Sequence, residues 1–457
     1  MRSIGPRLLC LVALLLLPRP SQAQQEEQDL VQAAPEPAPD TPPPPANPTS
    51  PPAESPRQAQ PALHPSVSLG GLSLAFSGYI QADVVAWSQA SVDEVDPSTG
   101  APLNETRVLV RRARLRADAS WKLVSALLEI GGDTVNGPAF KLVAAEVAAR
   151  LPWGTEAVPL AEASIGLFRI PFGHEVRQSN RDRLFLEESS MSRALFPGDY
   201  DLGVQLRGGW RFLRYQLAFT NGEPVGERSL PGRDFNAAKD FVGRLAAVGQ
   251  AGPVQFDVGL SGLRGTGFHA GTAATKDILV WRDDNEDGQV QEVELHVIGG
   301  MPATPSANFK RFALGCDAQV SVEIPRVGAL TVNGELMWAS NLDRGMFVAD
   351  PVALGRDKRE LGWAVGVIQE LPLGFAIGVR YDRYDPDADA HDQQGAALVP
   401  VDSSVSTWAF VASWRYESIG RLVVEYDHNE NALGRDINGA PTTLASDALT
   451  IRAEVGF

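Results

Sequence analysis

Three arginines at every second position give this sequence its clearest chemical signal. Within the run 108–118, one parity carries Arg112, Arg114, Arg116 and Asp118. The other parity carries apolar side chains, namely Leu109, Ala113, Leu115 and Ala117. Residues two apart on a strand share a face and lie about 7 Å from each other. The run therefore predicts a strand with a ladder of guanidinium groups on one face and an apolar surface on the other.

Two interpretations of this ladder are open. A row of guanidinium groups offers a passing anion several successive weak sites, which suits conduction through a pore. The same groups can instead pair with carboxylates and brace a wall. Acidic residues at matching positions of other alternating segments are Asp83, Glu129, Asp317, Glu323, Glu335, Glu425 and Glu454.

A second group of ligand-type residues lies at 283–294. It matches the twelve-residue calcium loop, with oxygen ligands at positions 1, 3, 5 and 12, glycine at 6 and a main-chain carbonyl at 7. The predicted ligands are Asp283, Asn285, Asp287, Gln289 and Glu294. The flanking segments 278–281 and 290–298 are typical of a hairpin and not of the usual helices. The pattern favours a structural Ca²⁺ in a long loop, and a solvated acidic loop tip is the alternative.

No pattern typical of an enzyme occurs. The six histidines form no metal-spaced pair, and no Gly-x-Ser-x-Gly, phosphate-loop or dinucleotide motif is present. With only Cys10 and Cys316, a disulfide scaffold and a cysteine-based zinc site are excluded. We therefore predict a protein that is not an enzyme and requires no cofactor.

The charge balance and the hydropathy restrict the class of protein further. The 457 residues carry 56 acidic against 40 basic side chains, a formal charge of −16. Such a balance argues against a nucleic-acid partner. No run of 18 apolar residues occurs, which excludes a helical membrane protein but not a membrane β-barrel.

The elements that must position the arginines are strands, because apolar and polar residues alternate over most of 68–457. In the last segment, Leu449, Ile451, Ala453, Val455 and Phe457 alternate with polar or small residues. The segment at 375–384 likewise places Arg380 on its polar parity. This period of two indicates strands with one apolar face.

The connections decide which solvent each face meets. Short turns such as 325–328 and 371–374 alternate with long acidic loops such as 342–358 and 385–404. Trp87, Trp121, Trp210, Trp408 and Trp414 lie near strand ends, as interfacial aromatic girdles do. The predicted fold is all-β, a 16-stranded antiparallel transmembrane β-barrel with long extracellular loops and an aqueous lumen. The predicted strands are 72–87, 106–119, 122–132, 139–150, 160–170, 201–209, 211–221, 239–249, 254–265, 309–324, 329–340, 359–370, 375–384, 405–417, 421–428 and 446–457.

Two segments precede the barrel. Residues 1–23 combine Arg2 and Arg7, an apolar run at 8–17 and small residues at 21 and 23, which predicts a cleaved signal peptide. Residues 24–67 contain 13 prolines between 33 and 65, which predicts a disordered periplasmic linker. A periplasmic or cell-wall partner for this linker and a solubilising leader without a partner are both open.

The block 165–206 resembles the phosphate-selective porins of the O and P type. The run 165–175, Ile-Gly-Leu-Phe-Arg-Ile-Pro-Phe-Gly-His-Glu, is similar to their Gly-x-Phe-Lys-x-Pro-Phe-Gly segment. The runs 179–187, 192–198 and 201–206 follow in the family's order, and 111–115 resembles its Arg-Arg-Ala-Arg-Leu element.

The resemblance implies a homotrimeric porin in the lipid of a Gram-negative-type outer membrane. It also implies that the loop after the fifth strand folds into the lumen. Arg181, Arg183 and Arg193 would then lie near a constriction, with Arg112, Arg114 and Arg116 on the wall. Arg169 replaces the family's lysine and keeps its charge. The expected solutes are small hydrophilic molecules, with a preference for anions such as phosphate. Because lysines are few and scattered, a weakly selective or cation-preferring diffusion pore and a structural or adhesive barrel are the alternatives.

Overall fold

The computed structural model describes residues 65–88, 106–135, 137–153, 158–223, 236–282, 284–285, 288–394, 397–432 and 446–457. The predicted signal peptide and nearly all of the predicted linker lie outside these residues. Among the described residues, no helix is long and apolar enough to cross a membrane.

The described residues form one large antiparallel sheet of seventeen strands. Sixteen of them make the barrel, and the short β1 (Ser66–Leu69) pairs only with the start of β2. The barrel strands are β2 (Leu72–Trp87), β3 (Arg107–Trp121), β4 (Val124–Asp133), β5 (Ala139–Arg150), β6 (Glu162–Arg169), β7 (Tyr200–Trp210), β8 (Leu213–Thr220), β9 (Asp240–Ala251), β10 (Val254–His269), β13 (Ala307–Ile324), β14 (Gly328–Ser340), β15 (Arg359–Glu370), β16 (Phe375–Asp385), β19 (Val405–Tyr416), β20 (Gly420–Asn431) and β21 (Ala448–Gly456). Every end of a strand lies within four residues of its predicted position.

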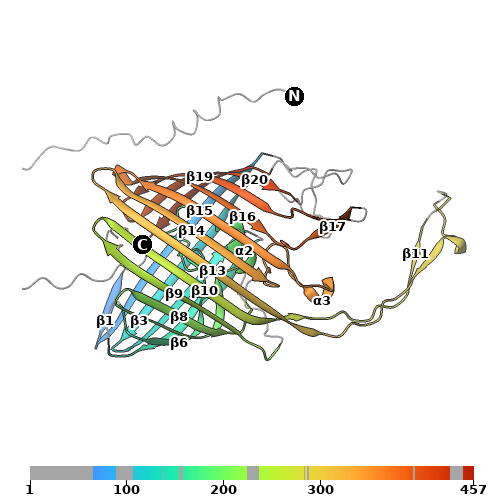
Figure 1. Cartoon of the computed structure of the whole chain (residues 1–457), viewed down its shortest axis with the longest axis horizontal. Coiled ribbons are helices and arrows are strands. Elements are labelled where there is room, and N and C mark those ends of the chain that lie inside the picture. The colour runs from blue at the N-terminus through green and yellow to red at the C-terminus, as the bar shows by residue number, and fades with distance from the viewer. Residues whose placement is uncertain are drawn as a thin grey trace, which may run out of the picture. The chain divides into compact units, whose positions relative to one another are not determined.

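The barrel is closed because its first and last strands pair with each other. Each strand is hydrogen-bonded to its neighbour in the chain, and β2 is bonded to both β3 and β21. The contact of β2 with β21 runs from Tyr79 opposite Gly456 to Trp87 opposite Ala448. Figure 1 shows the tilted strands around a common interior. The prediction of a 16-stranded antiparallel barrel is confirmed.

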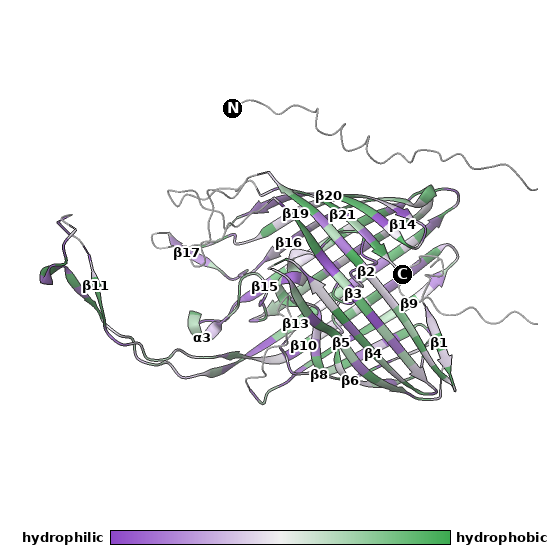
Figure 2. Cartoon of the chain, turned by 180° about the vertical axis from the view of Figure 1, so that it is seen from behind, coloured by the Kyte–Doolittle hydropathy of each residue, from purple (hydrophilic) through white to green (hydrophobic). Residues whose placement is uncertain are grey.

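Alternation along the strands separates an outer apolar face from an inner polar face. In β21, Ile451 and Val455 are 40% and 61% exposed, whereas Arg452 between them is 1% exposed. Figure 2 shows the same alternation of hydrophobic and hydrophilic residues along the strands. Cys316 lies on the outer, exposed parity. The lipid-facing and inward-facing parities predicted for these strands are therefore confirmed.

One irregularity changes the prediction for β3. The pairing of β2 with β3 skips Arg111, because Gln81 faces Arg112 while Ala82 faces Val110. Such a bulge reverses the parity of the residues beyond it. Leu109, predicted on the lipid face, is only 6% exposed and points inward. The prediction for Leu109 was wrong, because strict alternation along the sequence does not reveal the one unpaired residue of a β-bulge.

The remaining elements lie outside the barrel sheet. Two small hairpins are β11 (Ile278–Trp281) with β12 (Leu295–Ile298), and β17 (His391–Gln394) with β18 (Ala397–Pro400). The first of these confirms the hairpin predicted around the calcium-type loop. Two short helices are α2 (Ser190–Leu195) and α3 (Pro351–Leu354).

Candidate functional site: the lumen and its inner loop

The chain between β6 and β7 folds into the barrel. We call residues 170–199 the inner loop. Its apolar side chains are almost fully buried, including Phe172, Met191 and Phe196 at 0–1% exposure. They pack against inward-facing residues of β9, β10 and β13 to β16, among them Ala313 and Met337. The helix α2 belongs to this loop and lies within the outline of the barrel in Figure 1. The infolding that the family resemblance implied is present.

Carboxylates of the wall hold the main chain of the inner loop. Glu335 accepts hydrogen bonds from the main-chain N–H of His174 (3.3 Å) and of Glu175 (3.0 Å). Asp382 accepts from the N–H of Ser190 at 3.0 Å, and Glu425 accepts from the N–H of Leu186 at 3.0 Å. A buried main-chain N–H needs a partner, so these acids make an irregular segment stable inside the barrel.

Arginines of the wall hold the carbonyl groups of the same loop. Arg452 donates to the carbonyl of Leu186 at 3.0 Å, and Arg421 donates to the carbonyl of Arg183 at 2.8 Å. Arg380 donates to the carbonyl of Glu187 at 2.9 Å and to the carboxylate of Glu175 at 3.2 Å. Arg380, a predicted channel-lining residue, is therefore a brace.

A cluster of three arginines around Glu187 joins the inner loop to β3 and β21. Arg111 and Arg112 each bind both carboxylate oxygens of Glu187, with shortest distances of 2.8 and 2.9 Å. Arg452 adds a contact of 3.0 Å and also binds Asp83 at 2.7 and 2.8 Å. We call these five residues the Glu187 cluster. The β-bulge in β3 creates this cluster, because it turns two consecutive arginines, Arg111 and Arg112, towards the lumen.

The charge state of Glu187 follows from these neighbours. Burial by itself raises the pKa of the Glu187 carboxyl, but Arg111, Arg112 and Arg452 lower it more. The net result is a pKa well below the ordinary value. Glu187 therefore carries its negative charge at neutral pH, and the ladder residue Arg112 is neutralised.

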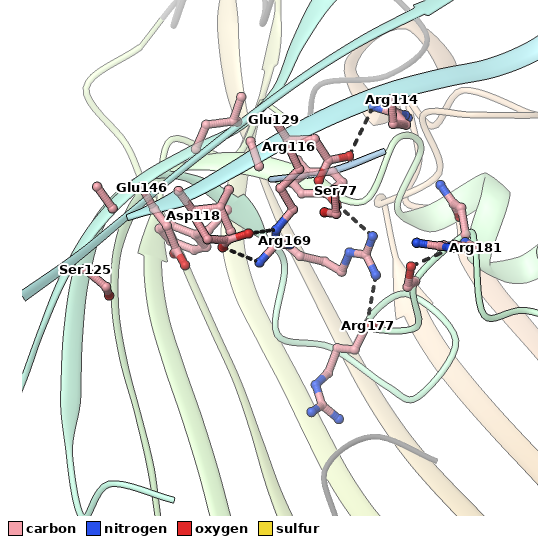
Figure 3. Close-up of a pocket in the computed structure, with 18 of the residues that line it drawn as sticks. Ser77, Arg114, Arg116, Asp118, Ser125, Glu129, Glu146, Arg169, Arg177 and Arg181 are labelled. Carbon is pink, nitrogen blue, oxygen red and sulfur yellow. Dashed lines mark hydrogen bonds and ion pairs between the residues drawn. The ribbon is translucent and has the colours of Figure 1, made fainter. Parts of the chain in front are cut away.

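The space that the inner loop leaves open is a cavity of about 920 Å³. Residues of β2 to β8 line one side, and Arg177 and Ser179 to Asp182 of the inner loop line the other (Figure 3). Its lining contains six arginines (Arg114, Arg116, Arg169, Arg177, Arg181 and Arg207) and four acids (Asp118, Glu129, Glu146 and Asp182). The cavity thus has a formal excess of two positive charges, in a chain whose formal charge is −16.

Several of the cavity arginines are paired with acids. Arg116 binds Asp118 through two bonds of 2.7 and 2.8 Å, which Figure 3 shows. Arg207 binds Glu162 and Glu146. Arg114 lies 3.8 Å from Glu129, a long contact that leaves its Nη1 without a hydrogen bond. These pairs weaken the field of the β3 ladder within the cavity.

Arg169 and Arg181 differ, because among the described residues neither donates a hydrogen bond to an acidic side chain. Arg169 donates to the hydroxyl of Tyr200 at 2.7 Å and to the carbonyl of Arg177 at 3.0 Å. Its guanidinium also lies 5.0 Å from the centre of the Tyr200 ring. Arg181 reaches main-chain oxygens of Ser418 and Phe457 at 3.4 Å each. Asp199 and Glu129 act on Arg169 only through their charge, so neither arginine is bound to one acid as Arg116 is to Asp118.

The structure divides the predicted channel-lining residues into three groups. Arg114, Arg116, Asp118, Arg169 and Arg181 line the cavity. Arg112, Arg183 and Arg380 are braces, and Arg183 binds Glu188 at 2.6 Å. Arg193 is an exposed residue of α2 and does not line the cavity. The sequence reasoning missed Arg111, Arg177 and Arg207, although the alternation in 201–209 placed Arg207 on the polar parity.

The structure describes three of the five predicted calcium ligands. Asp283 and Asp287 lie outside the described residues, whereas Asn285, Gln289 and Glu294 lie within them. Across the part of the chain that is described, no three or more His, Cys, Asp or Glu side chains gather as a metal site.

Solved structures with this fold are outer-membrane porins. An anion-selective porin from Comamonas acidovorans is similar with a TM-score of 0.50 and 10% identity, over 84% of this chain and 100% of that one. OprB of Pseudomonas putida is similar with a TM-score of 0.50 and 9% identity, over 84% of this chain and 94% of that one. No protein-family model and no curated protein sequence matches the chain. The chain therefore has the fold of the outer-membrane porins.

Proposed function

We propose that this protein is an outer-membrane porin that lets small hydrophilic solutes diffuse passively, with a weak preference for anions. The observation that carries the proposal is the arginine-rich cavity. A lumen with low-dielectric walls concentrates the electric field of its own charges. The excess of positive charge in the cavity therefore affects a permeating ion more than the net negative charge of the chain does.

The pairing of the arginines supports weak selectivity and not a tight phosphate site. A tight site requires several guanidinium groups converging on one anion. Here Arg112 is bound to Glu187 and Arg116 to Asp118, whereas Arg169 and Arg181 donate hydrogen bonds to no acidic side chain of the described residues. Successive weak sites allow rapid entry and exit. Phosphate is then one permeant anion among several. The bilayer experiment below therefore also tests whether the chain functions like the phosphate-selective porins.

The outer surface supports a homotrimer as part of this proposal. An aromatic row crosses the outer faces of β15, β16 and β19, where Tyr381 lies 5.1 Å from Trp363 and 4.7 Å from Trp408. Such residues are typical of the contact with lipid headgroups. The outer faces of β4 to β6 are less aromatic. They carry exposed aliphatic residues such as Leu128 (50%) and Ile165 (63%) beside Ala126 and Ala149, with Phe140 as an exposed aromatic residue. We propose that this mainly aliphatic face packs against a second copy, which cross-linking through cysteines placed there would test.

The experiment is a zero-current potential in a planar bilayer under a KCl gradient. We expect the wild-type protein to conduct and to favour Cl⁻ over K⁺. The double variant Arg169→Gln/Arg181→Gln removes the two cavity charges that are hydrogen-bonded to no acidic side chain and should shift the preference towards K⁺. The matched control is Arg211→Gln/Arg326→Gln, which removes two positive charges at exposed turns outside the cavity and should leave the preference unchanged.

Three results would contradict the proposal. Absence of conductance would favour a structural or adhesive barrel. A wild-type preference for K⁺ would mean that the acids dominate the lumen. Block by submillimolar phosphate, relieved in the double variant, would replace the weakly selective pore with a phosphate-specific one.

A further inference from the structure

The long connection between β10 and β13 carries its own small sheet, in which β11 and β12 pair from Ile278 opposite Ile298 to Trp281 opposite Leu295. Most of its side chains are open to solvent, for example Leu279 and Val297 at 65% and 64% exposure. Glu294, just before β12, is the exception at 2% exposure. A carboxylate is the side chain least expected to be buried in an otherwise exposed hairpin.

The contacts of Glu294 leave half of its carboxylate unused. Its Oε2 accepts a hydrogen bond from the indole Nε1–H of Trp281 at 3.0 Å and from the main-chain N–H of Gln291 at 3.3 Å. Its Oε1 is buried and has no hydrogen-bond partner. A buried anionic oxygen without a donor is costly, and a cation is the ligand that removes this cost.

The contacts of Glu294 also bring the two ends of the twelve-residue loop together. The main-chain N–H of Arg282, which precedes the loop, donates to the carbonyl of Glu294 at 3.0 Å. Gly288, at position 6 of the loop, has a φ of +70°, the left-handed conformation that the turn of a calcium loop requires. The loop 283–294 contains six carboxylates and no Lys or Arg, so no basic residue of the loop itself offsets them.

We propose that the loop 283–294 binds one Ca²⁺, with Glu294 as the closing bidentate ligand. Asn285 would supply a side-chain oxygen and Gln289 its main-chain carbonyl. Asp283 and Asp287 complete the ligand pattern in the sequence. This site is independent of the pore proposed above. A two-stranded sheet by itself is only marginally stable in water, so the ion would hold the end of the β11–β12 hairpin together.

Calorimetry on the full-length protein in detergent, stripped with EGTA and titrated with CaCl₂, tests the site. We expect one Ca²⁺ per chain with an affinity typical of extracellular calcium loops, a Kd on the order of 10⁻⁴ to 10⁻³ M. Glu294→Gln should weaken binding by about tenfold or more, because it removes the bidentate ligand. Glu292→Gln is the matched control. It removes the same charge two residues away, at an exposed position 10 that supplies no ligand.

A second readout locates the ion. Tb³⁺ replaces Ca²⁺ in such loops, and a nearby indole sensitises its luminescence. Trp281→Phe should remove most of the sensitised signal while Ca²⁺ still binds in calorimetry. The proposal is overturned if the wild-type protein shows no stoichiometric Ca²⁺ binding. It is equally overturned if Glu292→Gln and Glu294→Gln weaken binding to the same extent, because Glu294 would then be only a hydrogen-bonded anchor for Trp281.

Discussion

Replacing Glu187 by glutamine tests whether the inner loop is fixed to the wall by charge. The substitution keeps the size of the side chain and removes the carboxylate that Arg111, Arg112 and Arg452 share. Arg452 keeps Asp83 as its partner at 2.7 Å. Arg111 and Arg112 lose the acid to which both are bound.

The magnitude follows from how exposed the cluster is. The side chains of Arg112, Arg111 and Glu187 are 11%, 18% and 30% exposed. Removing one partner of a fully buried pair costs about 3–5 kcal/mol, and an exposed pair contributes less than about 1 kcal/mol. For this partly buried cluster we expect a loss of about 3 kcal/mol, which is roughly a hundredfold in the equilibrium between attached and released loop. The wall still holds the segments around 175 and 190, and Glu425, Arg452 and Arg380 still bind the main chain at 186 and 187. The substitution therefore loosens the neighbourhood of residue 187 and does not free the whole inner loop.

Three measurements separate the consequences. Single-channel recording should show increased open-channel noise, because a released segment moves within the lumen. Hydrogen exchange should show lower protection of the amides near Leu186 than in the wild type. The zero-current potential should also move towards Cl⁻, because the cluster gains one unit of positive charge.

Asp118→Asn is the matched control for Glu187→Gln. It frees Arg116 in the cavity without removing any contact of the inner loop. The zero-current potential should move towards Cl⁻ in this variant too, but the current noise and the amide exchange should remain those of the wild type. If Glu187→Gln leaves noise and exchange unchanged, the Glu187 cluster does not fix the loop, and the reasoning is refuted.

Three further predictions concern the loop and the outer face. Gly173→Ala should release the inner loop, because φ is +59° and an added Cβ would collide with Oε1 of Glu335. The control is Gly355→Ala, where φ is +70° but the space around the added Cβ is open. In a protease-sensitivity assay, Gly173→Ala should be cleaved much faster than Gly355→Ala. Acidification from about pH 7 to about pH 5 should leave the current noise unchanged, because the depressed pKa of Glu187 keeps the stabilising charge until the pH falls well below the ordinary glutamate value. Cys316, on the outer face, should be protected in liposomes from a charged thiol reagent added on either aqueous side and should react once the protein is unfolded, because lipid covers the side chain and a thiol reacts in contact with water; reaction in liposomes would place it in the lumen.

The sequence by itself determined the architecture. A membrane barrel meets lipid on its outer face and water on its inner face. Apolar and polar residues must therefore alternate from one residue to the next along each strand. This local rule is written into each segment, so the sixteen strands could be placed to within four residues. The inward direction of Arg112, Arg114 and Arg116 followed from the same rule, because lipid does not tolerate a guanidinium group.

Tertiary structure decided what each inward charge does. Glu187 lies 75 residues from Arg112 and 265 from Arg452, and no local pattern links them. The bulge that turns Arg111 inward depends on the pairing of β3 with β2, not on β3 alone. The sequence therefore left brace and anion path open for the ladder. The structure makes Arg112 a brace and leaves Arg116 paired with Asp118 within the cavity. Among the described residues, Arg169 and Arg181 have no acidic side chain as a hydrogen-bond partner, because packing of the inner loop sets which acids come within reach of each arginine.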